Sequence, residues 1–276
     1  MRWTRRAGPS DLEDRRSLGA RPGLKLGIGG TIVVLILSFV FKQDFFSLLG
    51  GAGAALPAGS ETPAVVTPEE ETLTRFVEFV VGDAQDVWTQ ILGPDYRRAP
   101  LVLFRGAVQS GCGYAQAAMG PFYCPGDERV YIDLAFYDEL RTRFGAPGDF
   151  AQAYVIAHEI GHHVQHLLGI EEAMRRASRQ QPGRANELSV ALELQADCFA
   201  GIWGYSTSQR NILEGGDVEE GLGAASAVGD DRIQQQTTGQ VNPDSFTHGS
   251  AADRARWFRR GLESGQVNAC DTFAAM

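Results

Sequence analysis

The 276-residue chain is predicted to be an α+β protein with a small early β-sheet and one transmembrane helix before the domain. Three observations predict this. Short apolar runs bounded by turn residues come early, apolar residues at helical spacing dominate the second half, and one long uncharged stretch lies near the start. With 43% apolar and 21% charged residues, the composition excludes global disorder.

The first expected element is the uncharged stretch Leu26–Phe41, which lies between the only two lysines of the chain. As a helix it would span about 24 Å, slightly less than a ~30 Å hydrocarbon core, and snorkelling lysines would supply the difference. Arginines crowd its N-terminal side. By the positive-inside rule we expect a cytoplasmic basic tail at 1–24, a single-pass transmembrane anchor at 25–42 and an extracytoplasmic (periplasmic or extracellular) domain.

A cleaved signal peptide is the alternative to this anchor. Signal peptides carry a small-residue cleavage site shortly after the apolar run. The nearest such site, Ala52-Gly-Ala54, lies beyond Lys42, so we favour a retained anchor. A buried core helix fits less well, because the flanking charges and glycines suit a membrane better.

The charge of the chain is divided unevenly around this segment. Residues 1–42 carry a net charge of +5 and the remainder carries −14, which together give the total of −9. Binding of nucleic acid by counterion release needs a basic face. We therefore expect no nucleic-acid partner.

Cysteine usage agrees with export, because Cys112, Cys124, Cys198 and Cys270 all follow the predicted anchor. An even number of cysteines in an oxidising compartment favours two disulfides. We pair Cys112 with Cys124, which flank a predicted hairpin, and this leaves Cys198 with Cys270. Their spacing does not match a cysteine zinc site. Free buried cysteines are the alternative.

A linker and a helix follow the anchor. Residues 43–66 are predicted to be a linker because this stretch is rich in glycine, alanine and proline. Thr67-Pro-Glu-Glu70 is a helix-start pattern, and apolar residues continue at helical spacing to Ile91. The domain is therefore expected to span 67–276.

The later elements follow from apolar periodicity and turn residues. The predicted strands are Leu101–Phe104 and a strand-turn-strand unit over 120–133. The predicted helices cover 138–144, 150–168, 187–203 and about 251–263. The polar, arginine-rich segment 171–186 is expected to be a mobile helix or loop, and whether it is a regulatory lid is left open.

The sequence His158-Glu-Ile-Gly-His162 lies in the second of these helices. Histidines four residues apart share one helical face, so both imidazoles can bind one cation, while Glu159 can hold a water on that cation. The apolar residues on both sides supply the helical context that the motif requires. The sequence therefore predicts His158 and His162 as zinc ligands.

Catalytic zinc needs a third protein ligand and an open position. His163 faces another side of the helix, and His166 lies about 12 Å along its axis from His158. Glu193 and Asp197 stand four residues apart in an apolar helix, where acidic residues are rarely buried unless paired or metal-bound. We expect Glu193 to bind the metal and Asp197 to accept the ring N–H of a ligating histidine. A carboxylate pair at the rim of the core is the alternative.

These residues resemble the gluzincin pattern H-E-x-x-H followed by E-x-x-x-D. Residues 67–276 are similar to the bacterial putative neutral zinc metallopeptidase family, the YpfJ-like group. The matching motifs are Gly120-Pro-Phe-Tyr-Cys-Pro125, Val130-Tyr-Ile-Asp133, His158-Glu-Ile-Gly-His162, Glu193-Leu-Gln-Ala-Asp-Cys198 and Thr247-His-Gly249. The resemblance implies a zincin-like fold, one Zn²⁺ per chain and a peptide or protein substrate.

By the same similarity, and in agreement with the helix geometry, Glu159 would be the general base. His248, the one histidine outside the metal helix, is a candidate donor to the oxyanion or proton donor, with Tyr131 or Tyr123 as alternatives. The strand around Val130–Ile132 is expected to be an edge to which an extended peptide adds.

The predicted function is therefore a membrane-anchored, exported zinc endopeptidase. A catalytically silent, zinc-stabilised binding protein is one alternative, although a structural zinc site has no need of Glu159. A zinc hydrolase of cell-wall amide bonds is another, because it would use the same ligands. The sequence does not give the substrate or the oligomeric state.

Overall fold

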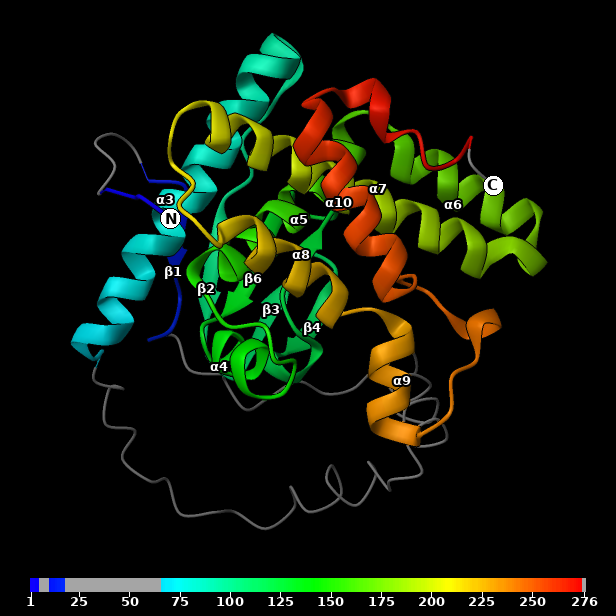
Figure 1. Cartoon of the computed structure of the whole chain (residues 1–276), viewed down its shortest axis with the longest axis horizontal. Coiled ribbons are helices and arrows are strands. Elements are labelled where there is room, and N and C mark those ends of the chain that lie inside the picture. Colours follow the sequence, from blue (N-terminus) through cyan, green and yellow to red (C-terminus); the bar gives the residue numbers. More distant parts are fainter. Residues whose placement is uncertain (5–9, 18–65, 275–276) are drawn as a thin grey trace. The chain divides into compact units, whose positions relative to one another are not determined.

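The computed structural model describes residues 1–4, 10–17 and 66–274, which belong to one compact unit (Figure 1). This unit is a mixed α+β structure in which helices predominate after residue 134, as predicted. The predicted anchor at 25–42 and all but the last residue of the predicted linker at 43–66 lie outside the described residues. Within the described ranges, no helix combines the length and the apolar character needed to span a membrane.

The main sheet has four strands in the order β1-β2-β6-β5. Its strands are β1 (Leu12–Asp14), β2 (Leu101–Phe104), β6 (Arg129–Asp133) and β5 (Phe122–Cys124). β1, β2 and β6 are parallel neighbours, and β5 is antiparallel to β6. β2 is buried on both faces, which explains its unbroken apolar sequence.

A separate two-stranded hairpin follows β2 and precedes β5 along the chain. Its strands are β3 (Ala107–Ser110) and β4 (Gly113–Gln116), and neither was predicted from the sequence. The strand predictions over 101–104 and 120–133 are confirmed. The predicted edge at Val130–Ile132 is wrong, because β6 is paired on both sides and β5 is the outer strand.

The N-terminal residues are part of this fold. Glu13 of β1 lies opposite Val102 of β2, and the Leu101 N–H donates to the Asp11 carbonyl at 2.7 Å. The domain therefore does not begin near residue 67 as predicted. A single membrane crossing between residues 24 and 43 would place β1 and β2 on opposite sides of the bilayer, so the pairing argues against the predicted cytoplasmic tail at 1–24.

Residues 1–4 reinforce this attachment. The Met1 ammonium donates to the Asp149 carboxylate at 2.8 Å and to Asp217 at 3.3 Å. The Trp3 ring packs edge-on against Phe76, with ring centroids 5.5 Å apart. The N-terminal segment thus joins the sheet to three helices.

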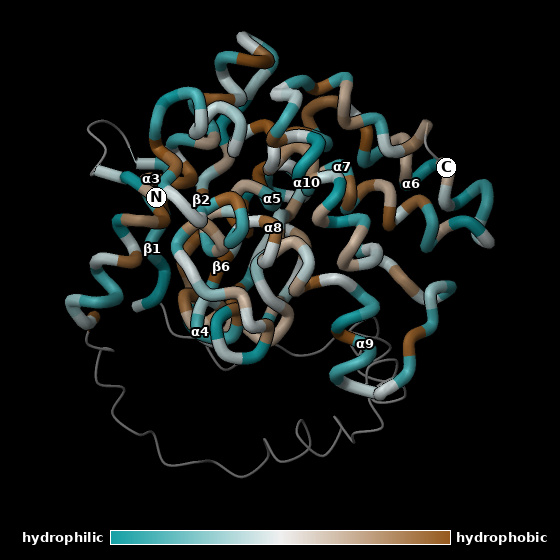
Figure 2. The backbone as a smooth tube through the Cα atoms, viewed as in Figure 1, coloured by the Kyte–Doolittle hydropathy of each residue, from teal (hydrophilic) through white to brown (hydrophobic). Residues whose placement is uncertain are grey.

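The α-helices account for more than half of the described residues. They are α3 (Pro68–Leu92), α4 (Ala135–Thr142), α5 (Asp149–Leu167), α6 (Ile170–Gln180), α7 (Ala185–Gln209), α8 (Asp217–Ala227), α9 (Asp230–Thr238) and α10 (Ala251–Ser264). The predicted capping box is present, because Thr67 and Glu70 exchange side-chain to backbone hydrogen bonds. α8 and α9 were not predicted, and α9 is mainly hydrophilic (Figure 2).

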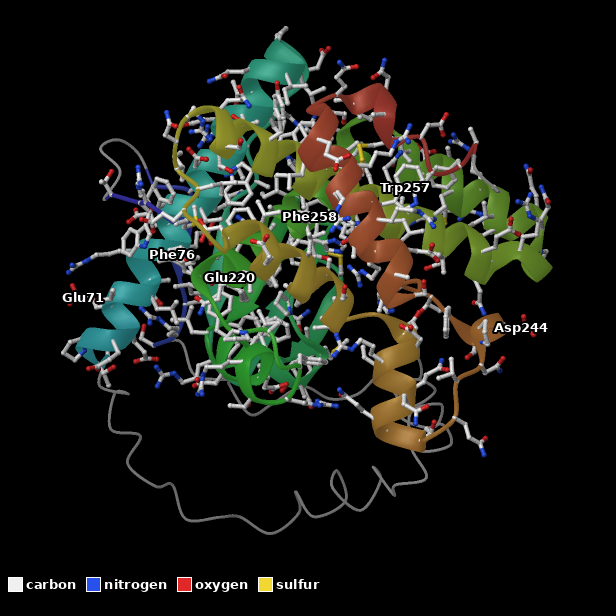
Figure 3. The ribbon with its side chains drawn as sticks, viewed as in Figure 1. Glu71, Phe76, Glu220, Asp244, Trp257 and Phe258 are labelled. Carbon is white, nitrogen blue, oxygen red and sulfur yellow. A yellow bond between two sulfur atoms is a disulfide. The ribbon has the colours of Figure 1, made fainter. Side chains whose placement is uncertain are left out.

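Two glycines allow the central helices to approach closely. A Cβ atom at Gly161 of α5 would lie 2.9 Å from the Ala196 carbonyl oxygen of α7. A Cβ at Gly261 of α10 would lie 1.9 Å from the Cys198 carbonyl oxygen. α7 is therefore packed against α5 on one side and α10 on the other, with Phe258 of α10 fully buried (Figure 3).

Both predicted disulfides are present, Cys112–Cys124 and Cys198–Cys270. The first joins the β3–β4 turn to the end of β5. The second joins α7 to the short 3-10 helix Val267–Cys270 that follows α10.

Candidate metal centre

The predicted ligands converge between α5 and α7. His158, His162 and Glu193 each offer a ligand atom, and these atoms all lie within 4.8 Å of one another. The Glu193 carboxylate is 3.2 Å from His158 Nε2 and 3.5 Å from His162 Nε2. Two imidazoles and one carboxylate match the three-ligand set of catalytic zinc sites.

Local structure explains this convergence. His158 and His162 are one helical turn apart on α5, and Glu193 lies on α7 one turn before Asp197. The close contact between Gly161 and Ala196 fixes the two helices so that these turns face each other.

The site favours a cation between its ligands. In the metal-free chain, burial lowers the pKa of His158, but Asp197 and Glu193 raise it more, to about 10. Burial raises the pKa of Glu193, yet the two histidines bring it well below its usual value. A bound divalent ion would take the place of the protons that these groups otherwise hold.

His158 is supported by charged groups. Its Nδ1 lies 2.9 Å from the Asp197 carboxylate, which is fully buried. Arg254 of α10 donates to both carboxylate oxygens of Asp197, at 2.9 and 3.0 Å, and the Tyr154 hydroxyl donates to the same carboxylate. Burial raises the pKa of Asp197, but Arg254 and His158 bring it below its usual value. Asp197 thus takes the position predicted for it.

His162 is supported by neutral groups instead. Its Nδ1 lies 2.9 Å from Gln165 Oε1, one turn further along α5. The Gln165 amide nitrogen donates to the Leu192 carbonyl at 2.7 Å and to Gln195 Oε1 at 3.1 Å.

A cleft of about 450 Å³ opens onto the three ligands. Glu159 lines it beside His158 and His162, which is the position required of a general base. Glu171 and Arg175 of α6 form part of one wall, so the beginning of the predicted 171–186 segment borders the cleft as a regular helix.

His248 also lines the cleft. The Asp230 carboxylate accepts the backbone N–H groups of Thr247, His248 and Gly249, which fixes this loop. A side-chain hydrogen bond with Asp230 raises the pKa of His248 despite partial burial.

The two tyrosines proposed as alternative oxyanion donors differ. Tyr123 lines the cleft, although its hydroxyl is paired with His163 Nδ1 at 3.0 Å. Tyr131 is buried in β6, its hydroxyl donates to Asp127, and it does not border the cleft. The geometry therefore favours His248 or Tyr123 over Tyr131.

Four residues around the candidate ligands were not predicted from the sequence. Tyr154 and Gln165 lie four residues before His158 and three after His162, so helical spacing could have identified them. Gln195 lies within the Glu193–Cys198 motif, but its contact with Gln165 forms only when α5 packs against α7, and Arg254 reaches Asp197 only through the packing of α10 on α7. Among the described residues, the group that could hold a metal here consists of His158, His162 and Glu193, without His163 or His166.

Comparisons with known proteins agree with this geometry. A family described as Putative neutral zinc metallopeptidase matches residues 1–273. "Uncharacterized protein YpfJ" of Escherichia coli (strain K12) is 45% identical over 287 residues, covering 99% of both chains. "Uncharacterized protein Rv2575" of Mycobacterium tuberculosis (strain ATCC 25618 / H37Rv) is 48% identical over 216 residues, covering 73% of this chain and 72% of the relative. No solved structure matches the chain. The chain belongs to the putative neutral zinc metallopeptidase family.

Proposed function

We propose that the protein is a zinc-dependent peptidase that hydrolyses peptide bonds in the cleft between α5 and α7. The observation that carries this proposal is the convergence of His158, His162 and Glu193 beside Glu159, at the base of an open cleft. A structural zinc site is usually closed by four protein ligands, whereas this set leaves a position free. The same set supports one Zn²⁺ per chain.

The residues around the cleft have separate roles in this proposal. Zinc, when bound, polarises the scissile carbonyl and makes water more acidic. The Glu159 carboxylate accepts a proton from the attacking water and passes it to the leaving amine. His248, kept protonated by Asp230, donates to the oxyanion that develops on the carbonyl oxygen.

The apolar part of the cleft lining suits an extended peptide. It contains Pro121, Phe122 and Phe136, and Met119 at the rim leaves 71% of its surface exposed. Phe122 lies on β5, the outer strand of the sheet, where main-chain groups are available to a peptide. We propose that peptide segments with apolar side chains bind along this part of the cleft.

We further propose that the domain is exported. Two disulfides are stable in an oxidising compartment and rare in a reducing one. Membrane attachment through residues 25–42 stays a prediction. Because β1 pairs with β2, residues 12–14 share the compartment of the active site, so attachment through residues 25–42 would have to leave both ends of that segment on one side of the bilayer.

Glu159→Gln in the full-length protein tests the mechanism. We expect the variant to bind zinc as the wild type does and to lose cleavage by about 100-fold or more, because the amide cannot accept the proton. Bound zinc is measured by metal analysis, and cleavage is measured on a disordered protein with and without a chelator. Full activity in the variant would contradict the mechanism.

The same assay separates the alternatives. Zinc bound without chelator-sensitive cleavage of any substrate would favour the binding-protein alternative. Cleavage of peptidoglycan fragments but not of the disordered protein would favour the hydrolase of cell-wall amide bonds.

A further inference from the structure

Two buried glutamines connect His162 to the C-terminal segment. Gln165 Oε1 faces His162 Nδ1, and Gln165 Nε2 donates to the Leu192 carbonyl and to Gln195 Oε1. Gln195 Nε2 in turn donates to the Cys270 carbonyl at 2.9 Å. Gln165 is fully buried and Gln195 leaves 6% of its surface exposed, so water cannot replace these partners freely.

The backbone carbonyls fix the orientation of both amides. A carbonyl oxygen only accepts, so the groups that face Leu192 and Cys270 must be the NH₂ ends of the two glutamines. The oxygen of Gln195 is then free to accept from Gln165. The oxygen of Gln165 is left facing His162, since its NH₂ group is already committed.

This orientation decides the tautomer of His162. An amide oxygen cannot donate, so His162 Nδ1 must carry the proton of the hydrogen bond. The lone pair of the neutral ring is then on Nε2, the nitrogen that lies 3.5 Å from the Glu193 carboxylate. We propose that Gln165 and Gln195 are positioning residues that hold His162 in its Nδ1–H form, with Nε2 ready to bind the metal.

The Cys198–Cys270 disulfide belongs to the same arrangement. Cys198 is one helical turn beyond Gln195 on α7, and its bond to Cys270 holds the Cys270 carbonyl over the Gln195 amide. Tying down the C-terminal segment therefore also fixes the last acceptor of the hydrogen-bond chain. This inference rests on the proposed zinc binding by His162.

Zinc affinity of the full-length protein tests the inference, measured by competition with a chromophoric chelator. Gln165→Met keeps the volume but removes the acceptor, and we expect zinc affinity to fall by about 10- to 100-fold. Gln195→Met is expected to cause a smaller loss of zinc affinity, because it removes one hydrogen-bond partner of the Gln165 amide but leaves that amide in place. Gln165→Glu keeps an oxygen toward His162, so its zinc affinity should lie closer to wild type than that of Gln165→Met.

Gln85→Met is the matched control. Gln85 of α3 is also fully buried and bonds to the Ala99 N–H and the Tyr96 hydroxyl, outside the metal centre. The variant should unfold at a lower temperature and keep wild-type zinc affinity. Thermal unfolding of all four variants separates loss of fold from loss of metal binding.

A spectroscopic measurement reads the tautomer directly. In the zinc-loaded protein with ¹⁵N-labelled histidine, long-range correlation spectra should show His162 protonated at Nδ1. A proton on Nε2 would overturn the inference, as would wild-type zinc affinity in Gln165→Met. Failure of the wild type to bind zinc would overturn the proposed function together with this inference, whereas the other two outcomes would overturn this inference alone.

Discussion

The two histidines proposed as metal ligands, His158 and His162, lie one turn apart on α5, yet their surroundings differ. His158 faces the buried carboxylate of Asp197, which is neutralised by Arg254, whereas His162 faces the neutral amide of Gln165. A charged support attracts a protonated or metal-bound ring strongly, but each of its members is costly to leave unpaired. A neutral support is weaker and fixes direction instead. Two histidines of one site can thus be supported differently, one by a charged partner that stabilises a positive charge and the other by a neutral partner that fixes the orientation of the ring.

Removing one of the proposed metal ligands should have the largest effect, because neither histidine support can then hold the ion. We expect His162→Ala and Glu193→Ala to lose bound zinc and all measurable cleavage, because two remaining ligands cannot hold the ion tightly. Metal analysis after dialysis, run beside the cleavage assay, checks this. His166→Ala is the control on the same helix, and a His162→Ala protein that still held one zinc per chain would contradict the assignment.

Breaking the charged support alone should be the next largest effect. Arg254→Met leaves the Asp197 carboxylate buried without its main partner, so we expect the free energy of unfolding to fall by about 3–5 kcal/mol. Gln165→Met removes only a neutral hydrogen-bond partner, for which we expect a loss of about 1–3 kcal/mol. Urea denaturation of the metal-free full-length proteins measures both.

Arg256→Met is the matched control for this pair, because Arg256 lies on the same helix and its ion pair with Asp253 is on the surface. We expect a change within about 1 kcal/mol. If Arg254→Met were no less stable than Arg256→Met, the contrast between the charged and the neutral support would be wrong.

The smallest effect is expected at a third histidine, His248, which extends the comparison to a more exposed side chain. His248 also has a carboxylate partner, Asp230, but its side chain is 53% exposed. Asp230 raises the pKa of His248, so the proton is held to higher pH and the proposed donor stays active there. Asp230→Asn removes this support and should move the alkaline limb of kcat/KM to lower pH, by roughly one unit or less.

The pH profile of a second loop variant provides the control. Asp244 lies on the same connection between α9 and α10 (Figure 3) and does not pair with His248. Asp244→Asn should leave the alkaline limb in place. An equal shift in both variants would indicate a general charge effect rather than the Asp230–His248 pair.

Much of the metal centre could be predicted because its pattern is local. His158 and His162 follow from spacing within one helix, and Glu193 and Asp197 stand out as acidic residues in an apolar helix. The long helices and β2 were equally visible, since their apolar residues repeat at regular spacing. The supports of the histidines were not, because Arg254 and Gln195 acquire their roles only when α7 packs against its neighbours.

The strand β1 could not be predicted for a different reason. Its sequence, Leu12-Glu-Asp14, has two acidic residues in three and no β pattern, and its partner β2 is far along the chain. The charge of Glu13 is compensated by the neighbouring Arg15 and by Arg129 of β6, and the second of these contacts is tertiary. Composition alone therefore indicates a separate tail at residues 1–24, whereas the pairing of β1 with β2 joins residues 12–14 to the domain.

The docked N-terminus also sets an order of events during synthesis. Met1 and β1 are made before their partners Leu101, Asp149 and Asp217, and Asp217 lies 216 residues after Met1. Contacts between such distant residues form slowly. β1 can therefore pair with the sheet only after residues 101–104 have been made, and the Met1 contacts form only when α5 and α8 are also present.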